Sequence, residues 1–343
     1  MLGRMAGAKR ILWADFARGL AALGVLAHHV DVPGTKQFYV FVDFFFVLSG
    51  FVLAKSLDSI QDRGDWRQFA LKRLFRFLPL VWLAIAAKVS LTFVGTLIGK
   101  PCEPYECEPA LILSAALLLQ VFVPATFMVL GPLWSLSVEL FVNFGYAAKF
   151  PMSRKATAFA GIGLGLVLTI ASYFVPRYGP NLFDNFHGFA RGVLAFGCGL
   201  AIAYLPKLAR PLWLVGLAAI GSVFVLKVDL GELQPLVATI VFTALVWSLS
   251  CLKRETDNRF YVFVATLFGN ASFGIYVWHG AIRGTVQKLA SIVGLDAGSI
   301  GYWSFNFVVL SVVSIAVALA TFHWIEMPIM GWFRKKVNVR LAK

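Results

Sequence analysis

Charged residues are scarce in this sequence. They make up 14% of the 343 residues, whereas hydrophobic residues make up 59%, and the mean hydropathy is +0.78. A soluble domain carries about 25% charged residues, because it must cover a water-facing surface. The longest polar stretch, Lys55–Arg76, is expected to form only a loop or an interfacial helix. A soluble globular fold is therefore excluded.

Cysteines and acidic residues are also few. Four cysteines cannot build a disulfide framework. Cys102 and Cys107, in the loop KPCEPYECEP, either pair in an oxidising compartment or remain free thiols. The 31 basic residues outnumber the 17 acidic ones and give a net charge of +14. In a membrane protein such an excess is expected on cytoplasmic loops, so we infer no nucleic-acid partner.

Long apolar runs fill the rest of the chain. Each is about 20 residues long, which is enough to cross about 30 Å of hydrocarbon. They lack the alternation of barrel strands, so we expect an all-α integral membrane protein, forming one domain over residues 1–343. The candidate segments are Ile11–Val30, Phe38–Ala54, Phe77–Ile98, Ala110–Leu130, Pro132–Ala148, Ala156–Val175, Ala190–Leu205, Leu212–Leu226, Pro235–Leu252, Phe268–Lys288 and Trp303–Ile325.

Loop charges reduce this set to ten spans. If all eleven segments crossed, four basic clusters would lie outside with the acidic loop, against the positive-inside rule. Segment Ala110–Leu130 contains Pro124 and precedes a Gly-Pro turn, so we expect it to be re-entrant or interfacial. Both termini are then cytoplasmic. The clusters placed inside include Lys149, Arg154, Lys155, Lys207, Arg210, Lys253, Arg254, Arg259, Arg334, Lys335 and Lys336.

The first span carries several ionisable residues. An ionisable residue in lipid costs at least about 2.5–3.5 kcal/mol and marks a candidate functional site. Arg18 and His29 lie about 60° and 40° from Asp15 around the helix, whereas His28 lies nearly opposite. We expect Asp15 to pair with Arg18 near the inner interface. Arg18 and His29 are the candidates for function.

Further polar groups lie in later spans. Asp43 could partner His29 or sit at the outer interface, and for Glu139 structural pairing and chemistry fit equally well. Arg73 and Arg76, one helical turn apart, could grip phosphates by bidentate bonds. The residues alone favour cytoplasmic anchors for this pair. Glu326 is expected to be structural or to mark a helix end before Pro328.

Six motifs occur in an order that resembles the acyltransferase-3 family of bacterial membrane acyltransferases, which have about ten spans. They are ADFARGLAALGVLAHH, VDFFFVLSGFVL, KRLFRFLP, GPLWSLSVELF, SFGIYVWHG and WIEMP. The resemblance implies transfer of an acyl group, most often acetyl from acetyl-CoA, to a saccharide hydroxyl. It also implies a multi-pass protein of the bacterial inner membrane.

The resemblance maps the family's Arg-x10-His signature onto Arg18 and His29, and its cytoplasmic arginine motif onto Arg73 and Arg76. This mapping raises donor binding above anchoring for the latter pair. Its Trp-Ser-Leu-x-x-Glu motif ends at Glu139. We expect Arg73 and Arg76 to hold the phosphates of acetyl-CoA, and Arg18 to orient the pantetheine arm or polarise the thioester.

His29 is expected to act as a general base or a transient acyl carrier, oriented by Asp43 or Glu139. The competing hypotheses are a glycan transporter or flippase, which would also carry intramembrane charges, and an inactive scaffold. No metal is expected, because the histidines lack ligand spacing. A serine hydrolase is not expected either, because no Gly-x-Ser-x-Gly elbow occurs.

Overall fold

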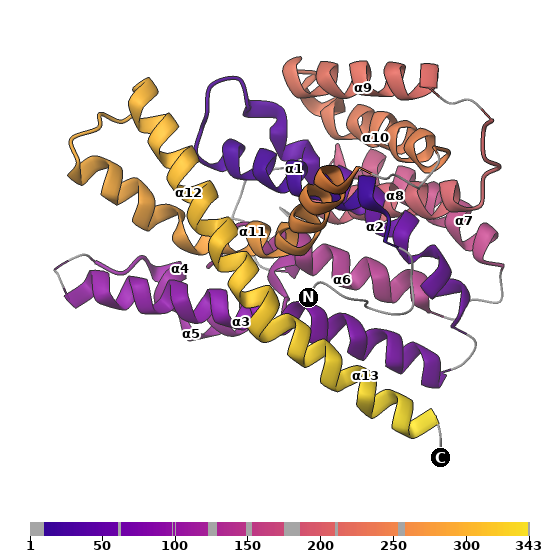
Figure 1. Cartoon of the computed structure of the whole chain (residues 1–343), viewed down its shortest axis with the longest axis horizontal. Helices are drawn as coiled ribbons and strands as arrows, with labels where there is room; N and C mark the ends of the chain where they lie inside the picture. Colours follow the sequence, from indigo (N-terminus) through magenta and orange to yellow (C-terminus); the bar gives the residue numbers. More distant parts are fainter. Residues whose placement is uncertain are drawn as a thin grey trace.

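The fold is a bundle of helices, seen in a computed structural model of the chain (Figure 1). The structure describes residues 10–60, 63–97, 99, 101–122, 129–148, 153–174, 186–209, 212–252 and 258–341. No β-strand occurs within these ranges. The expected all-α class is confirmed for this part of the chain.

Among the residues that the structure describes, seven stretches are long and apolar enough to cross a membrane, which makes this a multi-pass membrane protein. They contain η1 with α2 (Lys36–Val40, Phe41–Asp58), α3 (Arg63–Leu97), α7 (Arg154–Ser172), α8 (Phe186–Ala203), η4 with α10 (Gly231–Leu233, Gln234–Ser250), α11 (Arg259–Ile292), and α12 with η5 and α13 (Ile300–Thr321, Phe322–Glu326, Met327–Leu341).

Three further helices coincide with expected spans. They are α1 (Leu12–His29), α6 (Leu133–Ala147) and the apolar α9 (Leu212–Lys227). Polar residues lower the hydropathy of α1, and α6 and α9 have only 15 and 16 residues. Ten spans and cytoplasmic termini therefore remain predictions. Of the basic loop residues behind them, Lys149, Arg210, Lys253 and Arg254 lie outside the described residues.

The described residues between α3 and α6 form short helices. They are α4 (Pro104–Cys107), α5 (Pro109–Ala116) and η2 (Gln120–Phe122); Pro124 lies outside the described residues. The eight residues of α5 cover about 12 Å, too little to cross hydrocarbon. Cys102 and Cys107 form a disulfide, with their Cα atoms 6.3 Å apart. An ion pair of 2.6 Å between Lys88 and Glu106 fastens α4 to α3.

Two helix boundaries differ from expectation. The stretch Lys55–Arg76 is not only a loop or interfacial helix, because its second part is the beginning of α3, which continues through Pro79. The helical structure also does not end before Pro328. A π-helical turn at Phe322–Glu326 joins α12 to α13 there. Such a turn shifts the hydrogen-bond register, so a proline need not end the helix.

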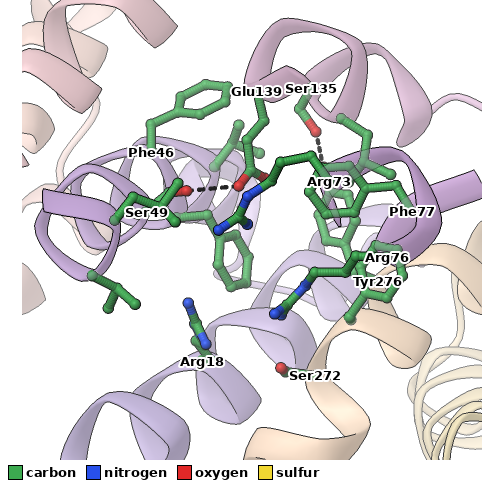
Figure 2. A pocket seen from close by; sticks show the side chains of 16 residues that line it. Arg18, Phe46, Ser49, Arg73, Arg76, Phe77, Ser135, Glu139, Ser272 and Tyr276 are labelled. Carbon is green, nitrogen blue, oxygen red and sulfur yellow. Dashed lines mark hydrogen bonds between the residues drawn. The ribbon is translucent and has the colours of Figure 1, made fainter. Parts of the chain in front are cut away.

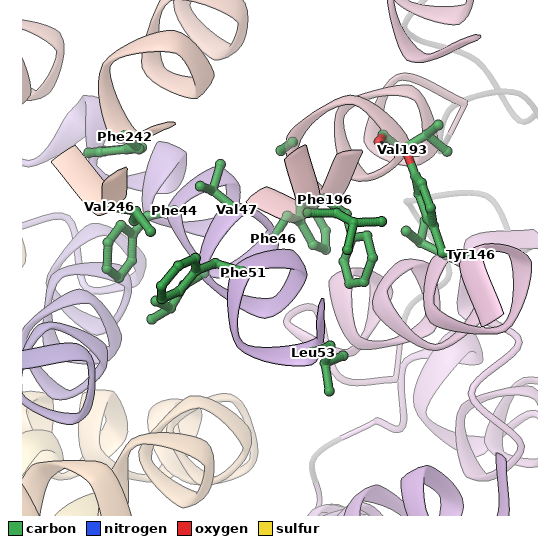
Figure 3. Packing of buried hydrophobic residues seen from close by; sticks show 14 of the residues in the cluster. Phe44, Phe46, Val47, Phe51, Leu53, Tyr146, Val193, Phe196, Phe242 and Val246 are labelled. Atoms are coloured by element: carbon green, nitrogen blue, oxygen red, sulfur yellow. Dashed lines mark hydrogen bonds between the residues drawn. The ribbon is translucent and has the colours of Figure 1, made fainter. Parts of the chain in front are cut away.

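Helix α2 lies at the centre of the bundle, and its phenylalanines pack against α8 and α10 (Figure 3). Close approach to α8 depends on glycine. A Cβ atom on Gly50 would overlap the carbonyl oxygen of Phe196, and one on Gly199 would overlap that of Val47. Small residues allow helix backbones to approach in this way within membranes. The contact fixes the position of Asp43 and Ser49, which lie on the same helix.

Candidate active site

Three arginines from two helices line one pocket. Arg18 comes from α1, whereas Arg73 and Arg76 come from the first half of α3. Figure 2 shows their guanidinium groups turned toward the same space. The pocket holds about 830 Å³ of empty space, including the part open to the surroundings. Residues far apart in the sequence therefore form a common cationic site.

One carboxylate also lines this pocket. Oε1 of Glu139 accepts a 2.7 Å hydrogen bond from the hydroxyl of Ser49, which joins α6 to α2 (Figure 2). Within the described part of the chain, no carboxylate oxygen lies within 4.0 Å of the guanidinium nitrogens of the three arginines. Their charges are thus not neutralised by ion pairing. Unpaired cations in a membrane protein are costly, so this arrangement favours an anionic ligand.

Asp15 does not pair with Arg18, contrary to our expectation. Its carboxylate accepts a 2.8 Å hydrogen bond from Nε of Arg10, whose Nη2 also donates to Asn270 at 2.9 Å. Arg10 precedes the helix and reaches Asp15 from the chain before it. Arg18, one turn further along α1, is left to face the pocket.

His29 lies outside this pocket, near the C-terminal end of α1, and contacts His279 of α11. Nδ1 of His29 is 2.9 Å from the carbonyl oxygen of Val25 and 3.2 Å from Nε2 of His279. Nδ1 of His279 is 3.0 Å from the carbonyl oxygen of Ile275. A carbonyl can only accept, so in the neutral rings both Nδ1 atoms carry the hydrogen. Nε2 of His29 then keeps its lone pair, as a general base requires.

Tyr276 connects the pocket with the histidines. Its hydroxyl is 2.5 Å from that of Ser135, inside the pocket, and its ring centroid is 5.9 Å from that of His279. Arg283, one turn beyond His279, donates a 3.1 Å hydrogen bond to the carbonyl oxygen of His29. That bond satisfies a carbonyl left open at the end of α1. Helix α11 thus places both the pocket wall and the partner of His29.

Asp43 lies apart from His29 and pairs with Arg191 of α8. Its two oxygens accept hydrogen bonds of 3.0 and 2.6 Å from Nε and Nη2 of that arginine. Asp43 is fully buried, so this bidentate pair compensates a charge that has no access to water. Neither Asp43 nor Glu139 has a described hydrogen bond to His29; that contact belongs to His279.

Comparison with known proteins identifies the family. A family model described as an acyltransferase domain matches residues 11–323, which is most of the chain. The chain belongs to the acyltransferase-3 family. It is therefore an acyltransferase, and a transporter or flippase is not supported. No solved structure matches this acyltransferase.

Curated relatives of this acyltransferase share between a fifth and a third of their aligned residues with it. Exopolysaccharide production protein ExoZ of Rhizobium meliloti is 27% identical, over 88% of this chain and 92% of its own length. Peptidoglycan O-acetyltransferase OatA of Listeria monocytogenes is 23% identical, over 92% of this chain but 55% of its own length. Protein 2 in the picA locus of Rhizobium radiobacter is 29% identical, over 48% of this chain and 97% of its own length.

Proposed function

We propose that this protein transfers an acetyl group from acetyl-CoA to a hydroxyl of an extracytoplasmic or lipid-linked saccharide. The observation that carries the proposal is the pocket in which three unneutralised arginines face one glutamate. Coenzyme A carries a diphosphate and a 3′-phosphate, and guanidinium groups bind such groups by paired hydrogen bonds. The relatives named for peptidoglycan O-acetylation and exopolysaccharide production support a saccharide acceptor.

The three arginines bind different parts of acetyl-CoA along the pocket. Arg73 and Arg76 lie in the first half of α3, on the expected cytoplasmic side, and bind the phosphates. Arg18 orients the pantetheine arm or polarises the thioester. Its α-carbon lies about 16 Å from that of His29 along a straight helix, so the donor spans the interval between them. Glu139, held by its hydrogen bond from Ser49, lines the same pocket and adds one negative charge to the three positive ones.

His29 acts as the general base. Its Nε2 takes the proton of the acceptor hydroxyl as the hydroxyl oxygen attacks the thioester carbonyl carbon. The carbon–sulfur bond breaks, and the departing sulfur of coenzyme A receives the proton from His29. The carbonyl oxygen of Val25 and Nε2 of His279 both accept from Nδ1 of His29, which leaves Nε2 of His29 for this step. Because acetyl-CoA is cytoplasmic and the acceptor is not, we place the protein in the bacterial inner membrane.

Transfer of label tests this proposal. Membranes that express the protein, and membranes with an empty vector, receive acetyl-CoA carrying a radiolabelled acetyl group together with envelope glycan. We expect label in the glycan as a base-labile ester, only in the presence of the protein. Free labelled acetate added at the same concentration is the control and should give none. Equal labelling with the empty vector would contradict the proposal.

A further inference from the structure

A second cavity lies at the outer ends of α7, α8 and α10, away from the donor pocket. It holds about 940 Å³ of empty space, including the part open to the surroundings. Its walls include Tyr39 of η1, Tyr173 just after α7, Arg191 of α8, and Glu232 of η4. In the ten-span arrangement all these positions face the extracytoplasmic side. None of them belongs to the six sequence motifs that resemble those of the family.

The walls combine hydroxyl groups with aromatic rings. Ser172 and Thr239 are buried, with 3% and 2% of their surface exposed, and both line the cavity. Oγ1 of Thr169 is buried and has no hydrogen-bond partner within the described part of the chain. A buried hydroxyl without a partner is unusual and calls for a ligand group that can bond to it. Aromatic faces beside a few polar groups are typical of small-molecule sites.

The charge of this cavity differs from that of the donor pocket. The positive charge of Arg191 is neutralised by Asp43 through two hydrogen bonds. Glu232 adds a carboxylate to the wall. A phosphate or another anion would therefore gain little here, whereas the donor pocket offers three arginines that have no ion-pair partner among the described residues. Hydroxyl, aromatic and neutralised charged groups suit an uncharged ligand that is rich in hydroxyls.

Tyr39 connects the cavity with His29 through the ring of His28. Its ring centroid is 5.9 Å from that of His28 and 5.5 Å from Cζ of Arg191. The ring of His28 lies 5.4 Å from that of His29. An ion pair of 3.0 Å between Lys36 and Asp229 joins the segment that carries Tyr39 to the loop before η4. The cavity wall and the end of α1 are thus held together.

We propose that this outer cavity binds uncharged sugar units of the acceptor and thereby presents a neighbouring hydroxyl to His29. The inference rests on the proposed function, because it supplies the acceptor side of the same reaction. The aromatic rings cover the apolar faces of the sugars, and the hydroxyls of Thr169, Ser172 and Thr239 bond to sugar hydroxyls.

Acceptor kinetics test the cavity. Initial rates of acetyl transfer into envelope glycan are measured while the glycan and acetyl-CoA concentrations are varied separately. Tyr173→Ala removes a ring that is 40% exposed, and Thr239→Val removes a hydroxyl while keeping the shape. We expect each change to raise the KM for glycan about tenfold, because specificity pockets lose this much with one group. The KM for acetyl-CoA should stay within about twofold of its original value.

Two control variants distinguish loss of this binding site from a general loss of structure. Phe174→Ala truncates the neighbouring ring, which is 85% exposed and does not line the cavity, and should leave both KM values unchanged. Tyr173→Phe keeps the ring but removes the bond from Oη to the carbonyl oxygen of Glu232. It should retain most of the affinity for glycan. The same KM for glycan in Tyr173→Ala, Phe174→Ala and the unchanged protein would overturn the inference.

Salt dependence tests the class of ligand. Binding of uncharged sugars should give the same KM for glycan from about 50 to about 500 mM NaCl, whereas an anionic acceptor would lose affinity steeply. A steep rise would overturn the assignment to an uncharged saccharide. No transfer by the unchanged protein would overturn the proposed function and, with it, this inference. Transfer with unaltered acceptor kinetics in the cavity variants would overturn the inference alone.

Discussion

His279 is the side chain in contact with His29, and it shows how far single residues could be assigned in advance. Both histidines were visible as polar groups in apolar stretches, but their pairing needs the packing of α1 against α11. Arg191 was missed, although it is the one charged residue in Ala190–Leu205 and the cost of charge in lipid marks it. Its bond to Asp43 again depends on contact between two helices.

The contact between the two histidines predicts a graded loss of activity. His279→Ala removes one of the two acceptors near Nδ1 of His29 and leaves the carbonyl oxygen of Val25. It should lower kcat about 10- to 100-fold, the loss seen when a group that orients a functional histidine is removed. His279→Gln places an amide oxygen near the lost nitrogen and should restore much of that rate. Steady-state kinetics check both variants. Equal loss in the two variants would indicate that His279 only fills space.

The arginine pair predicts a defect in donor binding. Arg73→Ala and Arg76→Ala should each raise the KM for acetyl-CoA about tenfold, because each removes a charge-assisted bond to phosphate. The double variant should be worse than either single one. Titration of acetyl-CoA in initial-rate assays measures the effect, with the KM for glycan as the internal reference. An unchanged KM for acetyl-CoA in the double variant would contradict donor binding at this site.

Most of the helices could be predicted as elements, because long apolar runs have a direct physical meaning in lipid. The boundaries were less predictable. Helix α3 begins at Arg63, within a polar stretch, and a π-helical turn joins α12 to α13, which contains Pro328. Hydropathy predicts the part of a helix that lies in lipid, but it does not predict how far the helix extends outside the lipid. Close packing at Gly50 depends on its small size, because a Cβ atom there would overlap the carbonyl oxygen of Phe196 in α8.

The contact between α2 and α8 predicts that a single methyl group destabilises the protein. Gly199→Ala places Cβ against the carbonyl oxygen of Val47. That oxygen is part of the backbone of α2, so it cannot easily move away. We expect a loss of about 1–3 kcal/mol, the usual cost of overpacking. Gly163→Ala is the matched control, since its Cβ would meet no atom within 4 Å. Thermal unfolding in detergent compares them, and equal Tm values would contradict the packing argument.

For the whole molecule, the described residues form two cavities of different charge. Ring contacts connect His29 to the first through His279 and Tyr276, and to the second through His28 and Tyr39. The cationic pocket is lined by residues at the expected inner side, and the outer cavity by residues at the opposite helix ends. Loop charge predicted a cytoplasmic and an outer side, because basic residues are retained on cytoplasmic loops, and the family resemblance implied that the donor binds at the cytoplasmic side. These sequence features could not reveal the outer cavity. Its hydroxyl and aromatic residues cannot be distinguished in the sequence from residues that only pack against neighbours.

This arrangement predicts the side of the membrane on which each end lies. A green fluorescent protein fused after Lys343 should fluoresce, and alkaline phosphatase at the same point should be inactive, because the C-terminus is expected in the cytoplasm. Fusion after Asp296, in the loop between α11 and α12, should give the reverse pattern. Active phosphatase at Lys343 would contradict the ten-span topology.

The central claim is that His29 is the base of an acyl transfer, and paired histidine variants test it most directly. Labelled acetyl transfer into glycan is measured in membranes with matched amounts of unchanged protein, His29→Ala and His28→Ala. His28 is the neighbouring histidine on another face of α1, and its Nδ1 bonds to the carbonyl oxygen of Thr35. We predict that His29→Ala abolishes transfer and His28→Ala retains most of it. Transfer by His29→Ala at the rate of the unchanged protein would contradict the account.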